Sequence, residues 1–217
     1  MNERIPEQQA LSWAIVYRVS LAGVRRRMAR SMVTLSCVAL AIAFVAYMLL
    51  LEDITTALVT LNNSELNVLL QEKGVDIFAE PGTDSMTLLL LSLALITCTV
   101  GILNSMLMSV TERIREIGTL KCLGARDMFI VKTYFVEATL QGVVGSIVGL
   151  LVGAVVAFGV SAADYPGFVF GNIPFGPALR SMLAAFLCGL VISVVAAIAP
   201  AYAAARKQPV EALRVEE

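Results

Sequence analysis

The sequence predicts an all-α membrane protein with four transmembrane helices, and its composition and hydropathy pattern carry this prediction. Hydrophobic residues make up 58% of the 217 residues and charged residues only 15%, whereas about a quarter of a soluble domain is charged. The mean hydropathy is +0.82. Four stretches without a charged side chain are each long enough to cross a hydrocarbon core of about 30 Å, which takes about 20 helical residues. A soluble core of this size rarely contains four such runs.

Residues 1–31, ahead of the first span, combine basic side chains with an apolar helical face. On a helical wheel, Trp13 and Leu21 lie on the apolar face and Arg18 lies opposite. This pattern predicts an N-terminal amphipathic helix at the membrane surface, although a plain basic anchor explains the same arginines. The basic region lacks the short layout of a signal peptide, so the first span, residues 32–51, is expected to remain as an anchor.

The remaining spans and connections follow from the positions of the charged residues. The expected segments are an outer connection over 52–84, a second span over 85–111, a coupling segment over 112–132, a third span over 133–163, an outer loop over 164–180, a fourth span over 181–205 and a tail over 206–217. Lys and Arg are abundant before the first span, in the coupling segment and in the tail. Because cytoplasmic loops are rich in Lys and Arg, both termini and the coupling segment are expected in the cytoplasm.

The outer connection over residues 52–84 is short and acidic. Ser64 is placed to cap a short helix through Leu70, and Pro81 with Gly82 indicates a turn. About thirty residues are too few to build a substantial core of their own. We expect a solvated loop here, with a basic extracytoplasmic protein as the alternative that the acidic bias suits.

The coupling segment is longer than a turn requires and is densely charged. A helix that continues out of the second span would pair Glu112 with Arg115 and Arg113 with Glu116 at i,i+3 spacing. Gly118 is expected to weaken this helix and to mark a bend. The segment therefore predicts an ordered docking element, where a solvated loop is the alternative.

The second half of the coupling segment carries the signals for a helix end and a new helix start. Gly124 suits the C′ position after a short helix, where a left-handed conformation is needed. Asp127 is placed to cap the helix that grows into the third span. The expected local order is thus helix, bend, short helix, glycine stop and new helix.

The stretch SVTERIREIGTLKCLGA, residues 109–125, resembles the motif after the second transmembrane helix of FtsX/MacB-like ABC exporter permeases. The glycines of the third span and the tail PAYAAARKQPVEALR, residues 200–214, follow in the order that this lipoprotein-release and macrolide-export family shows. The resemblance implies that a coupling helix docks into an ATP-hydrolysing subunit. The docking residues that it implies are Glu112, Arg113, Glu116, Ile117, Gly118, Leu123, Gly124 and Ala125. The large extracytoplasmic domain that the family often carries after the first span is missing here.

The third span carries small residues and one acid. Its glycines, most of which share one helix face, are Gly142, Gly145, Gly149 and Gly153. Small residues allow membrane helices to approach closely, so these glycines predict a helix-packing face. Glu137 lies one turn inside the apolar run, where it is expected either to reach water or to form an intramembrane ion pair with Lys132 or Arg113.

The tail combines a proline inside the fourth span with a candidate contact segment. Pro200 is expected to kink or end the fourth span. Pro209 and Glu211 suit the first turn of a short helix. Through the resemblance, these two residues and Arg214 are expected to contact the ATPase partner.

Several classes of function have no support in the sequence. The chain has no histidine, which excludes histidine-based catalysis and the common zinc sites, and it has no GxxxxGK[ST] phosphate loop. Its four cysteines form no CxxC pair and are expected to be small buried hydrophobes. No catalytic, metal or cofactor site is therefore predicted, and ATP with magnesium is expected only on a partner subunit. A net charge of −1 gives no reason to expect nucleic-acid binding.

The predicted function is that of a permease subunit of an ABC-type exporter or extruder in the bacterial plasma membrane. ATP hydrolysis by a separate subunit would drive movement of amphipathic or lipid-linked cargo. The expected partners are an ATP-binding cassette ATPase, a second permease chain (identical or related), the lipid bilayer and an extracytoplasmic protein. The alternative is a transmembrane signalling subunit that uses the same motion and moves no cargo.

Overall fold

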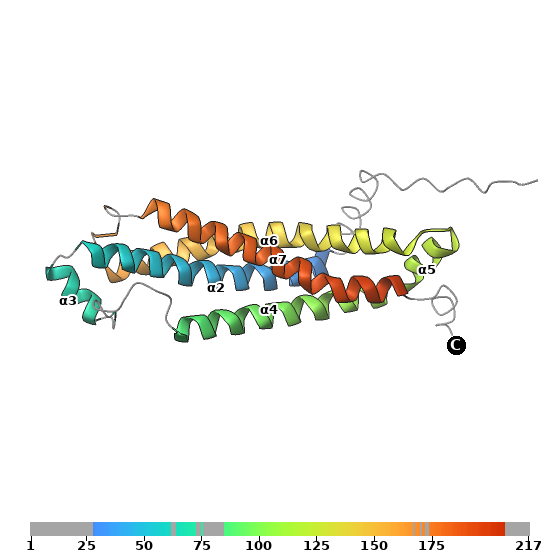
Figure 1. Cartoon of the computed structure of the whole chain (residues 1–217), viewed down its shortest axis with the longest axis horizontal. Helices are drawn as coiled ribbons and strands as arrows, with labels where there is room; N and C mark the ends of the chain where they lie inside the picture. The colour runs from blue at the N-terminus through green and yellow to red at the C-terminus, as the bar shows by residue number, and fades with distance from the viewer. Residues whose placement is uncertain are drawn as a thin grey trace, which may run out of the picture.

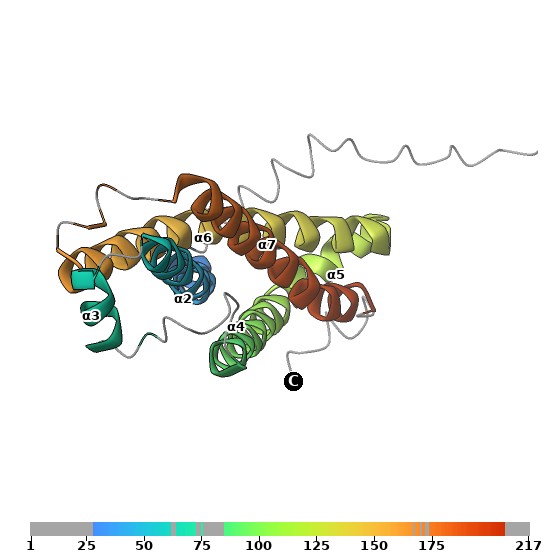
Figure 2. The same cartoon turned by 60° about the vertical axis from the view of Figure 1, so that its left-hand side comes forward.

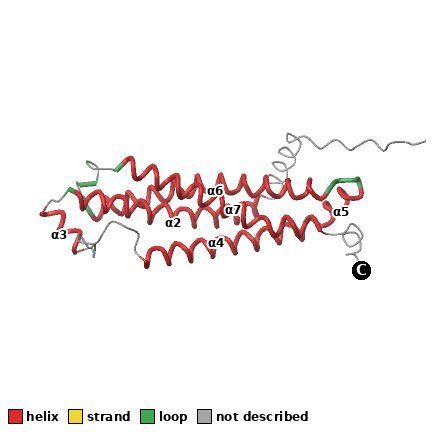
Figure 3. The backbone as a smooth tube through the Cα atoms, viewed as in Figure 1, coloured by secondary structure: helices red, strands yellow, loops and turns green. Residues whose placement is uncertain are grey.

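The computed structural model describes residues 28–61, 64–72, 75, 85–166, 168–169, 171 and 174–206. These residues form the helices α2 (Met28–Thr60), α3 (Ser64–Glu72), α4 (Ser85–Glu112), α5 (Ile114–Cys122), α6 (Asp127–Asp164) and α7 (Phe175–Arg206) (Figure 1). Strands are absent from this part of the chain (Figure 3). Helices α2, α4, α6 and α7 are long and apolar enough to cross a membrane, which confirms the predicted fold class. Most of the predicted N-terminal interfacial helix lies outside the described residues.

The four long helices form a bundle in which α2 and α7 lie between α4 and α6. Helix α6 packs against α2 and α7, and α4 packs against the same two helices. Figure 2 shows α4 on the side of α2 and α7 that faces away from α6. Helix α4 is consequently the least covered span, since 11% of its most apolar window is buried, compared with 28–33% for the other three.

The glycines of α6 lie where that helix meets its neighbours, as a close approach between helices requires. A Cβ atom at Gly149 would lie 2.6 Å from the Ala39 carbonyl oxygen of α2, and one at Gly153 would lie 2.5 Å from that of Ala43. Gly145 likewise faces α2. On the side of α6 that meets α7, Gly142 faces Ser193 of α7, and Gly189 of α7 faces Ser146 of α6. Residues without bulky side chains therefore bring three of the four long helices into contact.

The end of the bundle that carries α3 has a small core of its own. Helix α2 continues to Thr60, nine residues past the predicted end of the first span at Leu51. A separate cluster gathers Ile54, Leu58, Leu66, Leu70, Tyr165 and Val169. This agrees with the expectation that the 52–84 connection is too small to build a substantial core of its own, because α3 shares this core with the ends of α2 and α6. The predicted helix from Ser64 is confirmed.

Pro200 does not end α7, which continues through it to Arg206. A proline inside a membrane helix is tolerated where neighbouring groups satisfy the freed carbonyl, and Pro200 is buried in the bundle. The predicted tail contacts Pro209, Glu211 and Arg214 lie outside the described residues.

Candidate coupling site

Helix α5 projects at one end of the bundle, where the chain turns from α4 toward α6 (Figure 1). The bend between α4 and α5 falls at Arg113, whose φ of −97° and ψ of 7° lie in the sparsely populated bridge region. The prediction of a bend at Gly118 is wrong, because α5 runs through that residue and Gly118 is buried. The backbone stays bonded across Arg113, whose N–H donates to the Val110 oxygen at 3.1 Å. The bend is therefore a well-ordered corner.

A Schellman motif ends α5. Gly124 has a φ of 91°, which confirms the predicted left-handed conformation. Its N–H donates to the Lys121 oxygen at 3.0 Å, and the Ala125 N–H donates to the Leu120 oxygen at 2.9 Å. These two bonds satisfy carbonyls at the helix end, so the turn between α5 and α6 has a defined geometry.

The start of α6 differs from the prediction. Arg126 is the N-cap residue, with extended backbone and no capping side chain, and Asp127 is the first helical residue. The Asp127 carboxylate instead forms an ion pair with Lys121, whose Nζ lies 2.7 Å from Asp127 Oδ1. The carboxylate thus joins α5 to α6 while also lying in the first turn of α6, where negative charge is favourable.

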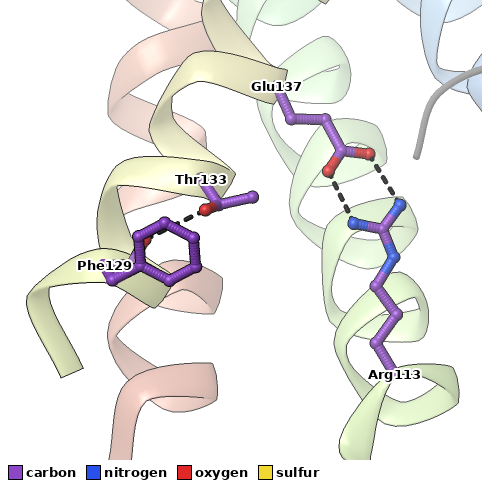
Figure 4. A network of polar contacts seen from close by, with 4 residues as sticks. All are labelled: Arg113, Phe129, Thr133 and Glu137. Carbon is purple, nitrogen blue, oxygen red and sulfur yellow. Dashed lines mark hydrogen bonds and ion pairs between the residues drawn. The ribbon is translucent and has the colours of Figure 1, made fainter. Parts of the chain in front are cut away.

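Arg113 and Glu137 form a buried, bidentate ion pair between the corner of α5 and α6 (Figure 4). Arg113 Nη1 donates to Glu137 Oε2 at 2.9 Å and Nη2 donates to Oε1 at 3.2 Å. The two side chains are only 12% and 5% exposed. The guanidinium also lies 5.9 Å from the ring centre of Tyr134. The expected intramembrane ion pair of Glu137 is therefore confirmed, with Arg113 as its partner.

One face of α5 points toward the chain's own helices. Its members Arg113, Ile117 and Lys121 recur every four residues and so share a helix face. Ile117 belongs to the main core cluster together with residues of α6 and α7. Lys121 Nζ also donates to the Ala205 oxygen at 2.5 Å, which places a cation at the C-terminal end of α7. This face of α5 is thus attached to α6 and α7 at both of its ends and in the middle.

The outward face of α5 and the following turn is exposed. Among the residues that the resemblance implied for docking, Glu112, Glu116, Leu123 and Gly124 are exposed and Ala125 is partly exposed, whereas Arg113, Ile117 and Gly118 face the bundle. Among the large apolar residues that the structure describes, Leu123 is the most exposed, at 83%.

Three exposed residues of this surface were missed from the sequence. Leu120, Cys122 and Met128 are exposed beside Leu123. The sequence does indicate them, because apolar side chains in the most charged part of the chain have no hydrocarbon to cover them. The residues that the family resemblance implied for docking do not include these three.

Comparison with known proteins assigns the family. The FtsX-like permease C-terminal family matches residues 88–209, which is more than half of the chain. The chain belongs to the FtsX-like permease family. The match covers most of α4 and all of α5, α6 and α7, and thus includes the corner at Arg113 and the glycine face of α6.

Relatives of this FtsX-like permease include larger export proteins. It is 39% identical over 144 residues to the macrolide export ATP-binding/permease protein MacB of Shewanella oneidensis, covering 63% of the chain and 20% of the relative. It is 37% identical over 136 residues to the pyoverdine export ATP-binding/permease protein PvdT of Pseudomonas entomophila, covering 61% of the chain and 20% of the relative. The permease thus spans about a fifth of the length of these curated relatives. Among its described residues, no cluster of side chains suits a metal ion.

Proposed function

We propose that this chain is the membrane permease part of an ABC-type exporter. In this proposal an ATP-binding subunit, which carries ATP and magnesium, docks on α5 and the turn that follows it. ATP-driven motion of that subunit then rearranges the four spans and moves amphipathic or lipid-linked cargo in a bacterial plasma membrane. The family assignment supports an exporter, and so does the similarity to macrolide and pyoverdine export proteins.

The observation that carries the proposal is the exposed apolar group formed by Leu120, Leu123 and Met128. These three residues belong to α5, to the turn that follows it and to the first turn of α6, and the exposed charged residues Arg126 and Asp127 lie next to Met128 in the chain. In the proposed orientation this end of the bundle is cytoplasmic, so lipid does not cover these side chains. Exposed apolar side chains with a polar rim are typical of a protein-binding surface.

The attachment of α5 supports a docking role in a second way. A docking element transmits force only if it is held in a fixed position on its own bundle. The Schellman turn at Gly124 and the bond from Lys121 to the Ala205 oxygen hold this surface in place. The turn is therefore preorganised for binding, which lowers the entropy lost on association.

A second permease chain, identical or related, is part of the proposal. Four spans are few for a transporter, and α4 leaves most of its apolar side chains uncovered by its own bundle. The uncovered side chains on one face are Leu89, Leu93, Ile96 and Val100. Their alternating spacing of four and three residues suits helix–helix packing, and a partner chain or lipid would cover them.

The test is purification of the tagged full chain from membranes of its own host, followed by identification of ATP-binding cassette proteins that copurify. Leu123→Glu is expected to abolish copurification of the ATP-binding cassette protein, because the substitution puts a charge on the docking surface. Val68→Glu is the matched control, since Val68 is exposed on α3 at the opposite end. Bound ATPase is also expected to protect the exposed thiol of Cys122 from a maleimide reagent.

Copurification that survives Leu123→Glu, with Cys122 labelled equally in the presence and absence of the ATPase, would contradict the use of this surface. Absence of any ATP-binding partner would contradict the proposed function itself. An ATPase rate that responds to an extracytoplasmic protein and to no cargo would instead favour the signalling alternative.

A further inference from the structure

The coupling helix is joined to α6 by side chains and not by close packing of the two backbones. Helices α5 and α6 are not packed side by side, and neither are α4 and α6. Motion of α5 therefore reaches α6 through the connecting turn and through side-chain contacts, which include packing of Ile117 in the core cluster that also holds residues of α6. Ion pairs between these segments include Arg113 with Glu137 and Lys121 with Asp127.

These two links differ in how well they carry a displacement. Asp127 is 68% exposed, and an exposed ion pair contributes little because water and salt screen it. The Arg113–Glu137 pair is almost fully shielded and has two parallel hydrogen bonds. A bidentate guanidinium–carboxylate pair fixes both distance and orientation. Inside a low-dielectric bundle, separating the two groups is strongly unfavourable.

The two ends of this pair occupy positions suited to transmission. Arg113 lies at the corner between α4 and α5, so its side chain is reoriented when the angle between these two helices changes. Glu137 lies ten residues inside α6, well past the turn that connects α5 to α6. Beyond Glu137, the same helix carries the glycines that contact α2 and α7.

We propose that the Arg113–Glu137 ion pair is the link through which displacement of α5 is transmitted to α6. This inference rests on the proposed function, because it requires an ATP-binding partner that displaces α5. When the partner moves α5, the angle at Arg113 changes, and the paired carboxylate pulls α6 with it. The connecting turn holds only the start of α6, so without the pair the motion of α5 is absorbed at that turn. Arg113 and Glu137 are thus positioning residues and not part of the docking surface.

The experiment measures the position of α6 in the complex with its ATPase. Nitroxide labels are placed at Leu88→Cys on α4 and Val155→Cys on α6, which are exposed apolar sites outside the α4 face proposed for a partner chain, in a chain without its native cysteines. Electron–electron resonance then gives the distance distribution between the labels with and without ATP. We expect an ATP-dependent shift in the unmodified pair and loss of this shift in Glu137→Gln, with the ATPase still bound.

Two further variants separate transmission from general damage. The charge exchange Arg113→Glu with Glu137→Arg keeps an ion pair between the same positions and is expected to restore the shift. Thr139→Val is the matched control on α6, because its hydroxyl bonds within its own helix to the Phe135 oxygen. This control is expected to shift like the unmodified chain. Arg113→Lys keeps the charge but loses the bidentate geometry, so a reduced shift is expected even if Glu137→Gln fails to fold.

The outcomes are distinguishable. An ATPase-bound Glu137→Gln complex with a normal shift would overturn the inference and leave the proposed function intact. Loss of the bound ATPase in Glu137→Gln would also overturn it, because the pair would then support docking and not transmission. An unmodified chain that binds no ATPase would instead contradict the proposed function.

Discussion

The contact between α2 and α6 predicts that a single added methyl group at Gly149 destabilises the bundle. A Cβ atom at this position would lie 2.6 Å from the Ala39 carbonyl oxygen and 3.0 Å from the Cβ of Ile42. Ordinary van der Waals contact begins at 3.4 Å, so the shortfall at the oxygen is about 0.8 Å. That oxygen belongs to helix backbone and has no rotamer to change. Gly149→Ala therefore forces the two helices apart.

The magnitude follows from comparison with a second glycine of the same helix. A Cβ atom at Gly159 would have nothing within 4 Å, so Gly159→Ala changes only helix propensity, which favours Ala over Gly by about 1 kcal/mol. Both substitutions share this gain. Overpacking of a tight interior costs about 1–3 kcal/mol. We therefore expect the free energy of unfolding of Gly149→Ala to lie about 1–3 kcal/mol below that of Gly159→Ala.

Reversible unfolding of the full chain in mixed detergent micelles, followed by circular dichroism, measures this difference. The two variants are compared at the same detergent composition, so that micelle effects on the unfolded state cancel. Equal stabilities within about 0.5 kcal/mol, which is the usual scatter between independent sites, would refute the close approach of α2 and α6 at Gly149.

Three other expectations test separate parts of the molecule. Leu66→Ala removes a fully buried side chain of the small core around α3; we expect α3 to lose protection from hydrogen exchange at a cost of about 2–5 kcal/mol, and unchanged protection would contradict that core. Val68→Cys is expected to react with a membrane-impermeant thiol reagent from outside the cell and native Cys122 only from inside; the reverse pattern would overturn the predicted orientation. Ser105→Ala removes the 2.6 Å hydrogen bond to Thr34 and is expected to lower the free energy of unfolding by about 0.6 kcal/mol. An unchanged unfolding free energy would show that this bond contributes nothing in the bundle.

Local chemistry was predictable wherever neighbouring residues decide it. The helix from Ser64 and the left-handed conformation of Gly124 follow from capping preferences and from the steric freedom of glycine, and the structure has both. The glycines of α6 were assigned to helix packing from their spacing alone. The structure added which helices they meet, α2 and α7.

The sequence left contacts open, or predicted them wrongly, where a side chain had a choice between a local partner and a distant one. Arg113 had two acidic partners predicted from the sequence, Glu116 at i,i+3 spacing and Glu137 in the third span, and the structure pairs it with Glu137. An ion pair with the exposed Glu116 would contribute little stability because water screens it, whereas the shielded pair with Glu137 has two hydrogen bonds and is strong once formed. The bend falls at Arg113 and not at Gly118, where helix propensity alone would place it.

Asp127 shows the same competition at a helix start, since its carboxylate binds Lys121 and does not cap α6. The small core around α3 likewise depends on residues from three separate segments. The sequence by itself determined the four spans, the coupling segment and the family motifs, because hydrophobic run length and local backbone chemistry are encoded in adjacent residues. Only the tertiary structure decided which face of α5 is attached and which is open, because burial and ion pairing at Arg113, Ile117 and Lys121 depend on helices far away in the chain.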